Sequence, residues 1–221
     1  MIEGAIFDVD GTILDSMPMW DNIGRIYLQQ KGIEAEPNLN RVMFTMTMPE
    51  AADYLKQKYA LPRSPEEIIT EINGMIQKFY ENKVPMKAGV HSLLLSLHAR
   101  DIPITAASLS QRGMIEAAFS RLGIDRLFRR VFTSTEIGAG KDRPDIFYAA
   151  QVHMGTDISS TWVFEDGLYA MKTAKAAGFR ICGVFDPSSI SDQEEIQSVC
   201  DIYLPSYEGV LVSRFEGESE L

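Results

Sequence analysis

The sequence predicts an α/β protein: a mostly parallel sheet flanked by helices, with an all-helical segment inserted after the first strand. From about residue 89 onward, short apolar runs alternate with amphipathic runs of helical length, which is typical of βαβ units. A similar apolar run opens the chain at residues 5–7. Between these two parts, residues 16–84 have helical spacing and lack β-branched runs. We therefore expect a Rossmann-like core of residues 1–14 and 85–221, and a helical domain of residues 15–84.

Two capping boxes mark helix starts in the inserted segment. Thr47 stands three residues before Glu50 and Ser64 three residues before Glu67, each with a proline in the first turn. Residues 33–46 have a mixed pattern. The expected helices cover about residues 19–31, 47–59 and 65–84.

The remaining elements alternate in type along the chain. We expect strands at about residues 5–8, 102–108, 130–134, 161–164, 179–185 and 201–204. We expect helices at about residues 90–99, 113–122, 144–153 and 168–177. Gly123 and Gly178 follow two of these helices, at positions where a glycine commonly ends a helix. The polar, acidic residues 213–221 are expected to fray.

Charge and composition limit the classes of partner. The 221 residues are 45% hydrophobic and 24% charged, which is ordinary for a protein with a packed core. A formal net charge of −10 argues against binding to nucleic acid or to an anionic membrane surface. A small anionic substrate would therefore need a local basic group. We expect a monomer or a weak homo-oligomer.

The cysteine positions and the N-terminal residues indicate in which cellular compartment the protein is expected. Cys182 and Cys200 form no close pair and no cluster with metal-ligand spacing, which fits a reducing environment. The chain enters its first strand without a basic and apolar leader, and no apolar run is long enough to span a bilayer. The expected location is the cytoplasm.

Polar side chains gather at the predicted carboxyl ends of the strands, where open parallel sheets bind ligands. Ordered along the chain, they are Asp8, Asp10, Ser108, Ser110, Lys141, Glu165 and Asp166. Each has a common structural explanation, such as an Asp-Gly turn, a serine helix cap, an exposed loop lysine or acids in a first helical turn. Their joint occurrence at four strand ends indicates a site. His91, His98 and His153 fall on helices and receive no catalytic role.

This set suits phosphoryl transfer through an acyl phosphate. Asp8 is the expected nucleophile, and Asp10 is the expected acid that protonates the leaving oxygen and later takes a proton from water. We expect Mg²⁺ at a metal site of Asp8, Asp10, Glu165 and Asp166, with Asp10 using its backbone carbonyl.

The other members of the set are expected to hold the phosphoryl group. Ser108 and Ser110 supply hydroxyl donors, and Ser108 stands near a helix N-terminus, where amide groups favour an anion. Lys141 neutralises phosphoryl charge and keeps Asp8 ionised. The expected catalytic residues are Asp8, Asp10, Ser108 and Lys141.

With these residues assembled, the chain resembles the haloacid dehalogenase superfamily, in its phosphatase and beta-phosphoglucomutase-like branch. The first motif is carried by residues 8–16, the second by Ser108, the third by Lys141 with residues 143–147, and the fourth by residues 164–178. The resemblance implies that residues 15–84 are a cap that closes over the site, excludes water and selects the substrate.

Three departures from the family pattern bear on the reaction. Asp142 adds an acid beside Lys141, and Gly167 and Ala170 stand where the fourth motif usually has Ser and Gly. We expect these changes to alter loop detail rather than chemistry. Trp20 stands where the mutases carry a histidine, and the cap lacks a clear counterpart of their basic residues, which favours hydrolysis over a mutase reaction.

We therefore expect a Mg²⁺-dependent phosphatase that acts on a small phosphorylated metabolite. A phosphosugar mutase and a non-catalytic ligand-binding protein are the alternatives. A phosphonatase, which uses a cap lysine, also stays open because the inserted segment holds several lysines. A true dehalogenase is disfavoured, since that branch generally lacks an acid at the position of Asp10.

Overall fold

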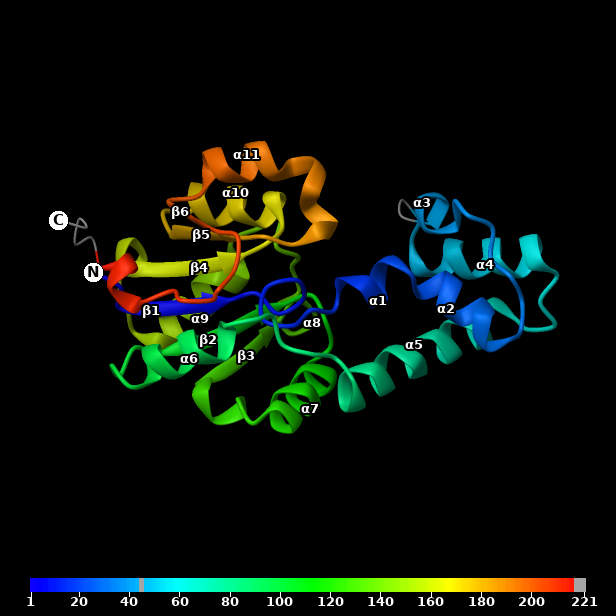
Figure 1. Ribbon diagram of the computed structural model, residues 1–221, viewed down its shortest axis with the longest axis horizontal. Helices are drawn as coiled ribbons and strands as arrows, with labels where there is room; N and C mark the ends of the chain where they lie inside the picture. Colours follow the sequence, from blue (N-terminus) through cyan, green and yellow to red (C-terminus); the bar gives the residue numbers. More distant parts are fainter. Residues whose placement is uncertain (44–45, 217–221) are drawn as a thin grey trace. The chain divides into compact units, whose positions relative to one another are not determined.

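The computed structural model describes residues 1–43 and 46–216, and the chain divides into two compact units (Figure 1). Unit 1 consists of Met1–Asp15 and Val84–Leu221, and unit 2 of Ser16–Lys83. Within the described part of unit 2 no strand is found, and within the described chain no helix is long and apolar enough to cross a membrane.

Unit 1 is built on a parallel sheet whose centre is the first strand of the chain. In the described residues the sheet has six strands in the order β3-β2-β1-β4-β5-β6, and every neighbouring pair is parallel. The strands are β1 (Gly4–Phe7), β2 (Ile104–Ser108), β3 (Arg130–Thr133), β4 (Thr161–Glu165), β5 (Arg180–Val184) and β6 (Ile202–Leu204). This topology confirms the predicted α/β fold class.

Helices cover both faces of this sheet, which explains why its strands are continuous apolar runs. The helices are α6 (Val90–His98), α7 (Arg112–Leu122), α8 (Ser134–Ile137), α9 (Asp145–Met154), α10 (Leu168–Ala176) and α11 (Gln193–Val199). Figure 1 shows α6 and α7 on the side of the sheet opposite to α10 and α11. Ile6 and Val163 of the central strands pack in one apolar cluster with α9 and α10. Phe7 and Phe164 stack with ring centroids 4.1 Å apart, which joins β1 to β4.

Unit 2 contains α1 (Met17–Asp21), α2 (Ile23–Gln30), α3 (Leu39–Met43), α4 (Met48–Tyr59) and α5 (Pro65–Asn82). Both predicted capping boxes are present. The Ser64 backbone N–H donates to Glu67 Oε2 at 2.7 Å and the Thr47 N–H to Glu50 Oε2 at 2.8 Å. These bonds satisfy helix-end amides and fix the starts of α4 and α5.

Two predictions about local structure were wrong. The single helix expected over residues 19–31 is split at Asn22, whose side-chain amide donates to the Pro18 carbonyl at 2.9 Å and so competes with the helical backbone. The expected fraying of residues 213–221 is contradicted at Val212–Phe215, a 3₁₀ helix held by the buried Phe215 ring against Trp162, 5.1 Å between centroids. Residues 217–221 lie outside the described part of the chain.

Candidate active site

Three buried carboxylates meet at the carboxyl ends of the two central strands. Asp8 directly follows β1, Glu165 ends β4 and Asp166 follows it. Because Phe7 pairs with Phe164 in register, the chain leaves both strands at the same level. One carboxylate oxygen from each residue lies within 4.8 Å of the other two, and all three residues are buried.

Lys141 is the buried cation at this cluster. It comes from the loop between α8 and α9, and its ammonium forms an ion pair with Asp8 Oδ1 and another with Glu165 Oε2 at 2.8 Å. One ammonium faces three carboxylates, so the buried cluster carries excess negative charge if all of them ionise.

The pKa shifts at the cluster reflect this excess of buried negative charge. Burial, followed by the charge of Glu165, raises the pKa of Asp8 to about 8, although Lys141 opposes the change. Burial and the charges of Asp8 and Glu165 also raise the pKa of Asp166 well above its usual range. Burial by itself would lower the pKa of Lys141. The negative charges of Asp8 and Glu165 outweigh this effect, so the pKa of Lys141 is raised. The site therefore lacks positive charge.

The donor set fits a hard divalent cation. Asp8 Oδ2 is buried and has no hydrogen-bond partner among the described residues, so one oxygen of the cluster remains available. All three side chains offer oxygen ligands, which Mg²⁺ prefers. Gly11 leaves room beside them: with φ at +87°, its missing Cβ would stand 2.3 Å from Asp166 Oδ2. A glycine is thus required for this close approach.

Asp10 is not one of the three clustered carboxylates, although its charge helps to raise the pKa of Asp8, and it faces two serines at the end of β2. Ser110 Oγ donates to Asp10 Oδ2 at 2.7 Å, and Ser108 Oγ makes a longer contact of 3.4 Å to the same oxygen. The Ser110 backbone N–H donates to Ser108 Oγ at 3.0 Å, which links the two serines. The structure thus brings the predicted residues together as two groups, one of clustered acids with Lys141 and one of Asp10 with the serines.

Thr12 is a site residue that is not predicted from the sequence. Its hydroxyl donates to Asp166 Oδ1 at 3.1 Å and orients this carboxylate. The signal was available, because Thr12 directly follows the Asp-x-Asp-Gly turn.

A second, partly buried ion pair near the cluster is also not predicted from the sequence. Asp186 follows β5 and is 1% exposed, and Lys87 Nζ lies 2.7 Å from both Asp186 Oδ2 and the Phe185 carbonyl oxygen. The negative charge of Asp186 contributes to the raised pKa of Asp166. Applying the strand-end rule to the predicted strand 179–185 would have found Asp186; nothing local identified Lys87.

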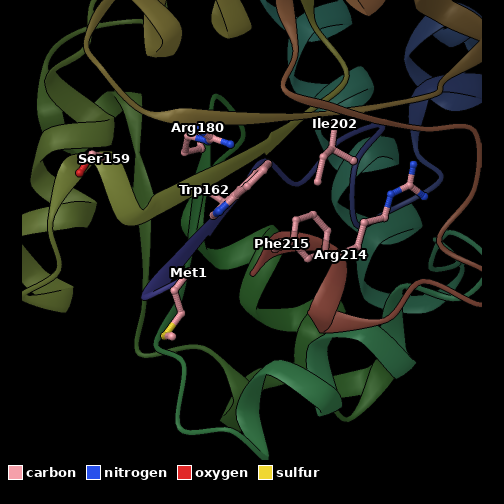
Figure 2. Close-up of a pocket in the computed structure, with 7 residues that line it drawn as sticks. All are labelled: Met1, Ser159, Trp162, Arg180, Ile202, Arg214 and Phe215. Carbon is pink, nitrogen blue, oxygen red and sulfur yellow. The ribbon is translucent and has the colours of Figure 1, made fainter. Parts of the chain in front are cut away.

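A hollow of about 250 Å³ lies at the opposite, amino edge of the sheet (Figure 2). Its lining residues are Met1, Ser159, Trp162, Arg180, Ile202, Arg214 and Phe215. In Figure 2 the guanidinium groups of Arg180 and Arg214 lie on opposite sides of the Trp162 and Ile202 side chains and do not converge. The hollow contains none of the predicted site residues, so the candidate site is the carboxyl edge.

A comparison with known protein families gives a match over most of the chain. A family model described as "Haloacid dehalogenase-like hydrolase" matches residues 5–184. The chain is 28% identical over 211 residues to the bifunctional riboflavin kinase/FMN phosphatase of Arabidopsis thaliana, with 92% of this chain but only 55% of that protein covered. It is 29% identical over 180 residues to the fructose-1-phosphate phosphatase YqaB of Escherichia coli strain K12, with 79% and 92% covered.

A solved structure shares the fold. A beta-phosphoglucomutase from Clostridium difficile superposes with a TM-score of 0.70 at 19% identity, covering 98% of this chain and 96% of that one. At this identity the likeness concerns the fold alone.

Proposed function

We propose that this chain, which belongs to the haloacid dehalogenase-like hydrolase family, hydrolyses a small phosphorylated metabolite with Mg²⁺ through an aspartyl phosphate on Asp8. The family and the relatives that are named phosphatases make it a phosphoric monoester hydrolase. One observation carries the finer proposal: Lys141 holds one oxygen of Asp8, while the other oxygen is buried and unpartnered beside two further acids.

Asp8 is the nucleophile in this proposal. Its free oxygen attacks phosphorus, the bond from phosphorus to the ester oxygen breaks, and the alcohol leaves. A carboxylate can approach a phosphate dianion only where their repulsion is cancelled. Lys141 supplies one positive charge beside Asp8. Asp8, Asp166 and the Asp10 carbonyl, with Glu165 beside them, would hold Mg²⁺, which would supply the remaining charge neutralisation.

Asp10 moves the proton. Its carboxyl group gives a proton to the departing ester oxygen, and the carboxylate then takes one from the water that attacks the aspartyl phosphate. Phosphate leaves, and Asp8 is regenerated. Before substrate binds, the Ser110 hydroxyl donates to Asp10 Oδ2 at 2.7 Å and holds this carboxyl group in one orientation. We assign Ser108, Ser110 and Lys141 to the phosphoryl oxygens, and the helical unit 2 to the role of a substrate-selecting cap.

The test is phosphate release by the purified chain with Mg²⁺ over a panel of sugar phosphates, FMN and small phosphorylated acids. Asp8→Asn and chelation of the metal should each reduce turnover by at least about a thousandfold, since the nucleophile or its charge neutralisation is lost. Asp125→Asn, which removes an exposed carboxylate in unit 1, is the matched control and should keep full turnover.

Two outcomes would contradict the proposal. The first is a wild-type protein that releases no phosphate from any member of the panel. The second is conversion of a sugar 1-phosphate to its 6-phosphate without net phosphate release, which would identify a mutase.

A further inference from the structure

An exposed aromatic ring stands beside the clustered acids. Tyr169 lies in the first turn of α10, three residues after Asp166, and is 50% exposed. A Cβ added to Gly167 would stand 3.4 Å from Tyr169 Cε1 and 3.3 Å from Glu165 Oε1. The edge of the ring and the Glu165 carboxylate therefore both lie beside Gly167.

Packing within the described residues does not account for this ring. The Tyr169 hydroxyl makes no hydrogen bond there, and the ring stacks on no other aromatic side chain of that part of the chain. Large rings are usually covered, because exposing them forgoes the free energy of burial. Burial of its inner edge and the charge of Glu165 raise the pKa of Tyr169 to about 12, so the phenol is uncharged at neutral pH.

A second exposed apolar residue follows β2, the other strand that flanks β1. Leu109 lies between Ser108 and Ser110 after β2 and is 53% exposed. In the sheet order β2-β1-β4, Leu109 and Tyr169 follow the two strands that flank β1. Neighbouring strands lie about 5 Å apart, so the axes of β2 and β4 are about 10 Å apart with β1 between them.

We propose that Tyr169, together with Leu109, contacts the organic group of the substrate and favours phosphomonoesters with an apolar or planar group next to the phosphate. The inference rests on the proposed function, because it requires the phosphoryl group to bind at Asp8. The ring face of Tyr169 supplies contact area at a small cost in side-chain entropy, and Leu109 supplies a second apolar wall. Tyr169 and Leu109 are specificity residues and take no part in proton transfer.

The test is equilibrium binding of two phosphonates, which lack the ester bond that the proposed reaction breaks, to the full chain in saturating Mg²⁺. The wild type should bind phenylphosphonate about three- to tenfold more tightly than methylphosphonate, the advantage typical of one aromatic contact. Tyr169→Ala should bring this ratio close to one. Tyr169→Phe, which keeps the ring, should preserve it, and Leu109→Ala should reduce it in part.

Tyr148→Ala is the matched control, because Tyr148 is an exposed tyrosine on α9 and should leave the ratio unchanged. A wild-type ratio near one, or an undiminished ratio in Tyr169→Ala, would overturn the inference. Thermal unfolding of each variant checks that it is folded.

Turnover separates this inference from the proposed function. If the phenyl preference depends on Tyr169 but the wild type releases no phosphate, the hydrolase proposal fails and the ligand contact stands. If phosphate is released and Asp8→Asn abolishes release, but the preference is independent of Tyr169, the contact fails alone.

Discussion

At the scale of single residues, the site depends on how closely backbone and carboxylates approach one another. Asp166 accepts a hydrogen bond from Thr12 and lies where a side chain on Gly11 would otherwise stand. Two acids before a glycine are common in soluble proteins, so this turn is uninformative when it is read alone. The turn becomes part of a site because Asp166, more than 150 positions later in the chain, occupies the space beside Gly11 where a side chain would otherwise stand.

Gly11→Ala should therefore have two effects. It should strain the backbone, and it should also displace the Asp166 carboxylate from the site. The added Cβ would meet Asp166 Oδ2 at 2.3 Å, so the carboxylate has to move. Gly32→Ala is the matched control, since Gly32 has a similar φ of +72° with nothing within 4 Å of its Cβ position. We expect each variant to lose about 1–2 kcal/mol of stability from the positive φ.

Only Gly11→Ala should also lose Mg²⁺-dependent turnover, by at least about tenfold, which corresponds to about 1.4 kcal/mol. Urea unfolding and steady-state kinetics of both variants check this. Equal turnover in the two alanine variants would show that the close approach to Asp166 is unimportant.

At the scale of elements, capping and ion pairs fix how helices begin and how they contact each other. The first turns of α4 and α5 were predictable, because a capping box is a local pattern of residue types. The break between α1 and α2 was not, because Asn22 has two competing sets of hydrogen bonds and the sequence does not show which one is formed.

Glu71 of α5 is the clearest ion-pair centre in unit 2. It lies 2.7 Å from Lys31 Nζ and 3.2 Å from Arg63 Nε, and it accepts a hydrogen bond from Tyr27 Oη at 2.7 Å. The hydrogen bonds from Lys31 and Tyr27, in that order, lower the pKa of Glu71 from its ordinary value of 4.5 to about 2.

Because the folded state holds the ionised form of Glu71, its contribution to stability is complete above pH 4.5 and is lost as the pH falls toward 2. Wild type should therefore lose more stability between pH 5 and pH 3 than Glu71→Gln. The difference should be about 1 kcal/mol or less, since the pairs are partly exposed to solvent. Urea unfolding at both pH values measures it, and parallel losses in the two proteins would contradict this role of Glu71.

At the scale of the whole molecule, negative charge is concentrated at the carboxyl edge of the sheet. A chain with a net charge of −10 buries three carboxylates around one lysine and a fourth, Asp186, against Lys87. Such a cluster is costly to fold without a further cation, and a ligand that binds only the folded state adds its binding free energy to stability.

Mg²⁺ should therefore raise the melting temperature of the chain. At a concentration of about a hundred times Kd, the gain should be about 2.7 kcal/mol. The Asp166→Asn variant should show a much smaller Mg²⁺-dependent rise, because one oxygen ligand loses its charge, whereas Asp125→Asn should behave as wild type. Thermal scans with Mg²⁺ and with chelator check this; equal shifts in wild type and Asp166→Asn would place the ion elsewhere.

The sequence by itself predicted the type and order of most elements and the polar residues that gather at the carboxyl edge of the sheet. It could do so because helix caps, strand alternation and polar strand ends are local patterns. Only the tertiary structure decided that β1 lies between β2 and β4, that Asp10 faces the serines while Asp8 faces Lys141, and that Asp186 pairs with Lys87. These facts depend on hydrogen bonds and ion pairs between segments far apart in the chain, and each pairing is chosen by the packing of the whole sheet.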